Sequence, residues 1–303
     1  MIDNMKASQP IWGHAAAFFT ILVWGITFIS TKVLLDSFTP LEITFFRLLM
    51  AVLALLIVRP PKFPFNIKDR LLLKSEWKSM FAGLCGVTLY FIFQNIALTH
   101  TLAANVGVLI SVAPLFIALI SHILWKDKLK GYFFIGFAAA LLGIVLISYN
   151  GNFVLQLNPL GDFLSILAAV VWALYSVTIK SINAPQSGIY DVTRNVFIFG
   201  FLFLLPFLPF FEFRIGIMRF AELPNLINLL FLGVVASALC FVTWNFAVQV
   251  LGPVRTSLYI YLVPFITIVT SALYLHEPVT PISAIGMVLI LVGMLISERE
   301  KLS

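Results

Sequence analysis

The stretch PLFIALISHILWKDKLKGYFFIGFAAALLG, residues 114–143, returns in outline as PFITIVTSALYLHEPVTPISAIGMVLILVG, residues 264–293. Each copy begins at a proline, reaches an acidic residue thirteen positions later and carries two glycines seven residues apart. The matched residues, all 150 positions apart, are Pro114 and Pro264, Asp127 and Glu277, Gly136 and Gly286, and Gly143 and Gly293; Asn95 and Asn245 share this offset. Gly13 and Gly161, Trp24 and Trp172, and Lys32 and Lys180 match at an offset of 148. The chain therefore reads as two related halves, residues 1–150 and 151–303.

The composition places the chain in a lipid bilayer. Hydrophobic residues make up 61% of it, charged residues 11%, and the mean hydropathy is +1.05, whereas soluble domains contain about 25% charged residues. Apolar stretches of about 20 residues, long enough to cross a hydrocarbon core as helices, recur ten times. They span residues 12–31, 40–58, 77–99, 103–125, 131–149, 159–181, 189–211, 225–248, 254–275 and 281–297.

Five helices in each half is an odd number, so the second copy must enter the membrane from the opposite side. We therefore predict an all-α polytopic membrane protein in which ten transmembrane helices form two inverted five-helix repeats. Many transporters are built from two such halves, with the substrate site between them.

The distribution of lysine and arginine predicts the orientation. If the N-terminus is cytoplasmic, the inner segments carry 15 of the 19 basic residues, as the positive-inside rule requires. The chain is then a multi-pass protein of the cell membrane with both termini in the cytoplasm. The basic residues are spread over several inner loops, which explains the net charge of +6 without a nucleic-acid partner. Cys85 and Cys240 lie mid-helix, so we expect no disulfide, no metal and no cofactor.

Polar residues within the spans follow helical faces. Span 77–99 carries Asn95 in one such stripe, and span 225–248 carries Asn245. Side-chain amides in membranes either line a polar cavity or bond to neighbouring helices, and the sequence leaves both readings open. Two further stripes contain Ser111 and Pro114 in one half and Tyr261 and Pro264 in the other. A proline inside a helix bends it, so we expect Pro114 and Pro264 to act as helix bends or hinges.

Two tryptophans lie deep in their spans, Trp24 in the first half and Trp172 in the second. Tryptophan is usually enriched at the membrane interface, so this matched pair predicts an aromatic wall for a small organic solute; simple packing is the alternative. Of the few charges at membrane depth, Arg47 is expected to pair with Glu42 or contact lipid headgroups, and Arg194 to pair with Asp191. Both pairs are interpreted as structural.

The segment from Val23 to Phe28 (VWGITF), followed by Lys32 and by Phe46-Arg47, resembles the opening of an EamA-type repeat of the drug/metabolite transporter superfamily. The repeat endings quoted above resemble the family pattern too, although Asp127-Lys128 replaces the usual glutamate. The resemblance implies a basket of ten helices around a central cavity lined by helices one, three, four, six, eight and nine. Its members commonly export amino acids or other small metabolites, and relatives carry nucleotide sugars or sugar phosphates.

We therefore expect a transporter, not an enzyme, that exports amino acids or similar metabolites by alternating access. Its partners would be a small-molecule solute and the lipid bilayer; the oligomeric state is open, and a monomer is compatible with the sequence. A nucleotide-sugar or other metabolite carrier, a membrane-embedded enzyme and a non-transporting receptor are the alternatives. The expected cavity residues are Trp24, Tyr90, Asn95, Ser111, Trp172, Tyr175, Asn245 and Tyr261.

Overall fold

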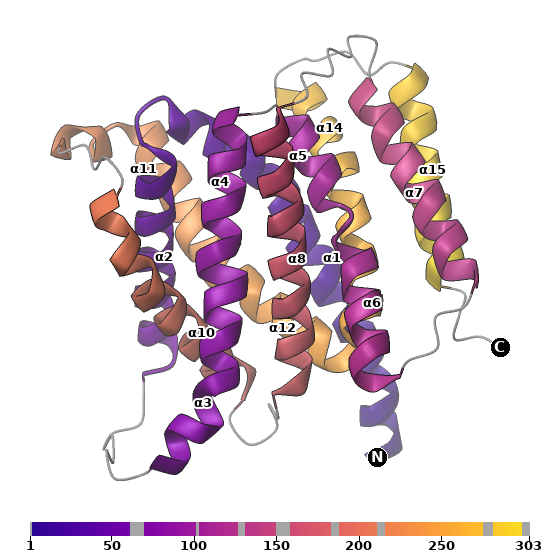
Figure 1. Cartoon of the computed structure of the whole chain (residues 1–303), viewed down its shortest axis with the longest axis horizontal. Coiled ribbons are helices and arrows are strands. Elements are labelled where there is room, and N and C mark those ends of the chain that lie inside the picture. The colour runs from indigo at the N-terminus through magenta and orange to yellow at the C-terminus, as the bar shows by residue number, and fades with distance from the viewer. Residues whose placement is uncertain are drawn as a thin grey trace.

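The computed structural model describes residues 2–60, 70–100, 103–126, 131–149, 158–182, 188–210, 216–274 and 281–298, and every regular element in these ranges is a helix (Figure 1). The first half contains α1 (Ile2–Leu35), α2 (Pro40–Val58), α3 (Arg70–Gly83), the π-helix η1 (Leu84–Leu89), α4 (Tyr90–His100), α5 (Ala103–Ile110), α6 (Ala113–Trp125) and α7 (Gly131–Tyr149). The second half begins with α8 (Pro159–Ser181), α10 (Ile189–Leu204), the 3-10 segments η2 (Leu205–Phe210) and η3 (Ile217–Phe220), and α11 (Leu223–Leu230). It ends with the π-helix η4 (Phe231–Leu239), α12 (Cys240–Leu251), α13 (Pro253–Ser257), the 3-10 segment η5 (Leu258–Tyr261), α14 (Leu262–Tyr274) and α15 (Pro281–Glu298).

Among the described residues, six helical segments are long and apolar enough to cross a membrane, so the protein is a helical polytopic membrane protein. They are Pro10–Leu35, Pro40–Val58, Glu76–His100, Pro159–Ser181, Ile189–Pro209 and Leu223–Leu251. Three shorter apolar helices, Ala113–Trp125, Gly131–Leu146 and Ala284–Ser297, accompany them. The number of ten spans stays a prediction. Asp127 and Glu277, which mark the ends of the repeated stretches, lie outside the described residues.

The two expected spans that contain the matched prolines are interrupted. In the first, α5 ends at Ile110, and α6 begins at Ala113 with Pro114 in its first turn. In the second, the 3-10 segment η5 precedes α14, whose third residue is Pro264. A proline lacks the N–H that would continue the helical hydrogen bonds behind it. Both prolines therefore follow a change in helix geometry.

Helices α7 and α15 stand side by side at one edge of the bundle (Figure 1) and form the largest contact between any two described elements. A Cβ atom added to Gly136 would lie 2.5 Å from the carbonyl oxygen of Gly293, and one added to Gly143 would lie 2.5 Å from that of Gly286. Gly136 and Gly286 are equivalent in the repeat, and so are Gly143 and Gly293. Gly136 thus contacts the equivalent of Gly143, and Gly143 contacts the equivalent of Gly136. The two helices are therefore antiparallel, and small residues allow their backbones to touch.

Side-chain caps fix the first turns of α2 and α8, two helices that contribute residues to the site. Helix α2 begins with a capping box, in which the Thr39 hydroxyl accepts from the backbone N–H of Glu42 and the Glu42 carboxylate accepts from that of Thr39. Helix α8 begins where the Asn158 side chain accepts from the backbone N–H of Gly161. Such caps satisfy N–H groups that the first helical turn leaves without partners. Helix α8 lies in the middle of the bundle, between α4 and α6 (Figure 1).

Candidate functional site

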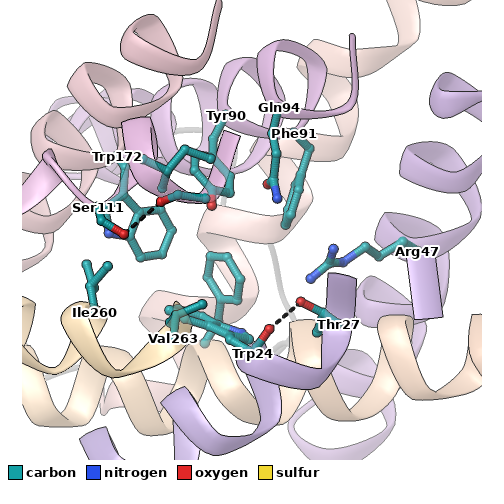
Figure 2. A pocket seen from close by; sticks show the side chains of 13 residues that line it. Trp24, Thr27, Arg47, Tyr90, Phe91, Gln94, Ser111, Trp172, Ile260 and Val263 are labelled. Carbon is teal, nitrogen blue, oxygen red and sulfur yellow. Dashed lines mark hydrogen bonds between the residues drawn. The ribbon is translucent and has the colours of Figure 1, made fainter. Parts of the chain in front are cut away.

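A cavity lies between helices from both halves of the chain (Figure 2). Its volume is about 60 Å³, which is room for a few water molecules and less than the roughly 300–1,000 Å³ of typical ligand pockets. The cavity is therefore narrow. Its lining residues are Trp24 and Thr27 of α1, Arg47 of α2, Tyr90, Phe91 and Gln94 of α4, Gly107 and Ile110 of α5, Ser111, Trp172 of α8, Phe241 of α12, Ile260 of η5 and Val263 of α14.

Five aromatic side chains line the cavity: Trp24, Tyr90, Phe91, Trp172 and Phe241. The rings of Trp24 and Trp172 meet edge to face at 5.3 Å, and Tyr90 lies 5.0 Å from Trp172. Phe241 contacts both tryptophans, at 5.5 Å and 5.8 Å. The indole N–H of Trp24 donates to the carbonyl of Ala236 at 2.9 Å. The rings therefore pack against one another, and the contact of Trp24 with Trp172 joins helices of the two halves.

One positively charged side chain, that of Arg47, is among the residues that line the cavity. Arg47 is 7% exposed and lines the cavity. Its Nε donates to the Ser237 hydroxyl at 2.6 Å, and its guanidinium lies 4.2 Å from the centre of the Phe91 ring. Among the described residues, no carboxylate lies within ion-pairing distance of Arg47.

Three further side chains in the lining, Thr27, Gln94 and Ser111, are polar and uncharged. The Ser111 hydroxyl donates to the carbonyl of Gly107 at 2.7 Å, and the Thr27 hydroxyl donates to the carbonyl of Trp24 at 2.6 Å (Figure 2). Both oxygens keep acceptor capacity toward the cavity. The Gln94 amide points toward the same space beside Phe91. The cavity can therefore accept hydrogen bonds from a solute as well as donate to it.

Of the eight expected cavity residues, the structure places Trp24, Tyr90, Ser111 and Trp172 around the cavity. The two asparagines lie elsewhere and make equivalent bonds between helices. Asn95 donates to the Thr44 hydroxyl at 2.6 Å, and it lines a separate hollow of about 280 Å³ between α2 and α4. Asn245 donates to the Thr193 hydroxyl at 3.0 Å. This is the helix-bonding alternative that the sequence left open.

The two remaining tyrosines are also absent from the lining. Tyr175 is fully buried behind Trp172, with ring centres 5.0 Å apart, and its hydroxyl donates to the Asn245 carbonyl oxygen at 2.5 Å. Tyr261 is buried against Phe137 of α7, and its hydroxyl has no hydrogen-bond partner among the described residues. Tyr175 thus supports the aromatic wall from behind, whereas Tyr261 packs toward α7.

One of the two expected ion pairs is wrong. Glu42 pairs with Arg219 at 3.1 Å, across 177 residues of sequence, and not with Arg47. Five residues along a helix place two side chains about 140° apart around its axis, so Glu42 and Arg47 face different neighbours. The pair of Arg194 with Asp191 is confirmed, at 2.8 Å.

The lining residues that the polar and aromatic stripes missed are Arg47, Phe91, Ile110, Ile260 and Val263. The four apolar ones carry no signal that separates them from other membrane-facing residues. Arg47 does carry one, because a charge several residues inside an apolar span is costly unless it faces a cavity or a partner. Among the described residues, no group of three or more histidine, cysteine, aspartate or glutamate side chains could hold a metal ion.

Comparison with known proteins finds one family twice along this chain. A profile of the EamA-like transporter family matches residues 11–149 and, a second time, residues 159–298. The chain belongs to the EamA-like transporter family. This EamA-family protein is therefore a membrane transporter, and its two family matches fall one in each half of the chain.

Named relatives span nearly the full length of this transporter. It is 29% identical to an uncharacterized transporter of Archaeoglobus fulgidus, over 95% of this chain and 98% of the relative. It is 27% identical to a probable terminal-alkyne amino-acid exporter of Streptantibioticus cattleyicolor (98% and 96% covered). It is 26% identical to a probable amino-acid metabolite efflux pump of Escherichia coli K12 (93% of each). Among the solved structures that match, one crystal structure has a TM-score of 0.74 at 19% identity, over 96% of each chain, which supports the fold alone.

Proposed function

We propose that this EamA-family transporter exports amino acids or closely related metabolites across the cell membrane by alternating access. The observation that carries the proposal is the narrow cavity between helices of both halves, lined by aromatic rings, a few uncharged polar groups and one arginine. Aromatic faces suit the apolar part of such a solute, and the polar groups suit its charged ends. The names of the two relatives that handle amino acids or their metabolites support the same substrate class.

In this proposal residues 1–150 and 151–303 form two inverted five-helix repeats, ten helices in all, with both termini in the cytoplasm. The contact between α7 and α15 supports the inversion. A two-fold axis in the membrane plane makes equivalent helices antiparallel. If two residues of these helices are in contact, the residues equivalent to them must be in contact as well. Gly136 with Gly293 and Gly143 with Gly286 follow that rule.

Transport requires the cavity to open toward each side in turn. Trp24 and Trp172 belong to different halves, so their edge contact would separate as the halves rock. The changes in helix geometry just before Pro114 and Pro264 are the positions where α5–α6 and η5–α14 can bend. We assign Trp24, Tyr90, Ser111 and Trp172 to solute contact, and the two prolines to bending.

Transport by purified protein in liposomes tests the proposal. A panel of labelled amino acids is offered to the wild type with and without an imposed pH gradient. The test variant carries Trp24→Ala and Trp172→Ala. The matched control carries Trp12→Ala and Trp77→Ala, which remove two tryptophans that are 65% and 56% exposed and absent from the cavity lining.

We expect saturable flux of at least one amino acid in the wild type and in the control, and its loss in the cavity variant. Flux that survives in the cavity variant would reject the cavity as the solute site. A wild type that moves no amino acid in the panel would reject the substrate class. The response to the gradient separates proton-coupled transport from facilitated diffusion.

A further inference from the structure

The cavity contains a buried positive charge that the protein does not neutralise within the described residues. Arg47 is 7% exposed, and none of the other residues that line the cavity is acidic. A charge at membrane depth is costly unless it is paired. Glu42, the acidic residue nearest to it along α2, is held by Arg219 instead. Within the described residues, the charge of Arg47 thus has no acidic partner and is available to a ligand.

The guanidinium is held so that one edge stays open. Its Nε donates to the Ser237 hydroxyl of η4, and one of its faces covers the ring of Phe91. An arginine has five N–H donors. The four on the two terminal nitrogens make no hydrogen bond to a described side chain or backbone group, and the group points into the cavity (Figure 2). This edge is a preformed fork for two acceptor oxygens.

We propose that Arg47 binds the carboxylate of the transported solute through this fork. A carboxylate presents two oxygens in the plane that the fork matches, and the resulting bonds are charge-assisted. A carboxylate also carries one negative charge, which balances one guanidinium. A phosphate dianion would leave a net charge in a small apolar space. Because the carboxylate would occupy the same cavity, this assignment rests on the proposed function.

The rest of the cavity suits the remainder of an amino acid. The Gln94 amide oxygen and the Ser111 hydroxyl can accept from an ammonium group, and aromatic faces attract cations as well. Trp24 and Trp172 line the same cavity and offer a surface for an apolar or aromatic side chain. Ser237 acts as a positioning residue, because it fixes the guanidinium without lining the cavity itself.

Four probes that share one phenyl group separate the carboxylate from the ammonium: phenylalanine, phenylalaninamide, 3-phenylpropionate and phenethylamine. Their binding to the purified transporter is followed by the fluorescence of the cavity tryptophans, and inorganic phosphate is added as a competitor. The variants are Arg47→Met, which removes the charge, and Arg47→Lys, which keeps the charge and loses the fork. Arg194→Lys is the matched control, because Arg194 is equally buried, is paired with Asp191 and is absent from the cavity lining.

We expect the wild type and the Arg194→Lys control to bind phenylalanine and 3-phenylpropionate more tightly than phenylalaninamide and phenethylamine. Arg47→Met should weaken binding of both carboxylates by about 10- to 100-fold and leave the amide and the amine unchanged. The affinity of Arg47→Lys for the two carboxylates should lie between that of the wild type and that of Arg47→Met. Phosphate should not compete at equal concentration. If Arg47→Met does not fold, the comparison of acid with amide in the wild type decides.

Equal binding of phenylalanine and phenylalaninamide, failure of both carboxylates to bind, or effective competition by phosphate would each overturn the assignment. If liposomes show phenylalanine flux while phenylalanine and phenylalaninamide bind equally well, the proposed function stands and the carboxylate site at Arg47 is rejected. Conversely, binding of 3-phenylpropionate that depends on Arg47, in a protein that transports no amino acid, would retain the carboxylate site and reject amino-acid export.

Discussion

Substituting Asn245 by leucine should destabilise the fold and leave the solute cavity intact. Asn245 is fully buried; it donates to the Thr193 hydroxyl at 3.0 Å and accepts from the Tyr175 hydroxyl at 2.5 Å. Hydrogen bonds between helices in membrane proteins contribute about 0.6 kcal/mol on average and about 1.7 kcal/mol at most. Loss of two such bonds is therefore expected to lower the free energy of unfolding by about 1–3 kcal/mol. The Thr193 hydroxyl keeps its own bond to the carbonyl of Ile189.

The coupling between Asn245 and Tyr175 gives the sharper test. In Asn245→Leu the buried Tyr175 hydroxyl is left without its acceptor, which adds a penalty for an unsatisfied polar group. Adding Tyr175→Phe removes that hydroxyl, so the double variant should lose less stability than the two single variants together. Unfolding in mixed detergent and SDS micelles, followed by circular dichroism, measures all four proteins.

Solute binding is measured on the same folded samples. Additive effects of the two substitutions would refute the hydrogen bond as a stabilising contact. If Asn245→Leu leaves the free energy of unfolding unchanged but abolishes solute binding, Asn245 contacts the solute and its role in helix packing is refuted. Asn95→Leu is the comparison from the other half, where the side chain lies beside an open hollow.

Two further predictions concern packing and charge. Gly143→Ala should lower the free energy of unfolding by about 1–3 kcal/mol, because its methyl group would meet the backbone of α15; Gly131→Ala, whose added Cβ meets nothing within 4 Å, should be neutral in the same assay. Arg219→Gln leaves the fully buried Glu42 carboxylate without its ion pair, which should cost about 3 kcal/mol and lower the Tm in detergent. The double variant with Arg219→Gln and Glu42→Gln should recover part of that loss. Equal Tm values for the wild type, Arg219→Gln and the double variant would contradict a stabilising ion pair.

Much of the fold follows from apolar length and from the repeat. The expected spans at 40–58, 77–99 and 159–181 correspond to segments that the structure describes as long apolar helices. The spans at 103–125 and 254–275 are instead divided before Pro114 and Pro264. Apolar length alone cannot locate such a division, because it depends on which neighbours receive the backbone groups that a proline leaves free.

The site was less accessible to sequence reasoning. Helical spacing identified the faces that carry Trp24, Ser111 and Trp172, but it does not say which neighbouring helix a face meets. Asn95 and Asn245 share a face with cavity residues, yet each amide turns to a threonine on the next helix. The partner of Glu42 comes from a distant segment around η3, which no pattern within α2 could supply. The free charge of Arg47 follows from that distant pairing.

The contact of α7 with α15 also sets an order of events during synthesis. Gly136 and Gly293 are 157 residues apart, and at about 5–20 residues per second the ribosome needs roughly 10–30 s to add that length. For this interval α7 resides in the membrane with its glycine groove facing lipid chains or another temporary neighbour. The edge of the bundle closes only when the final helix arrives, so truncation within α15 would leave that groove permanently open.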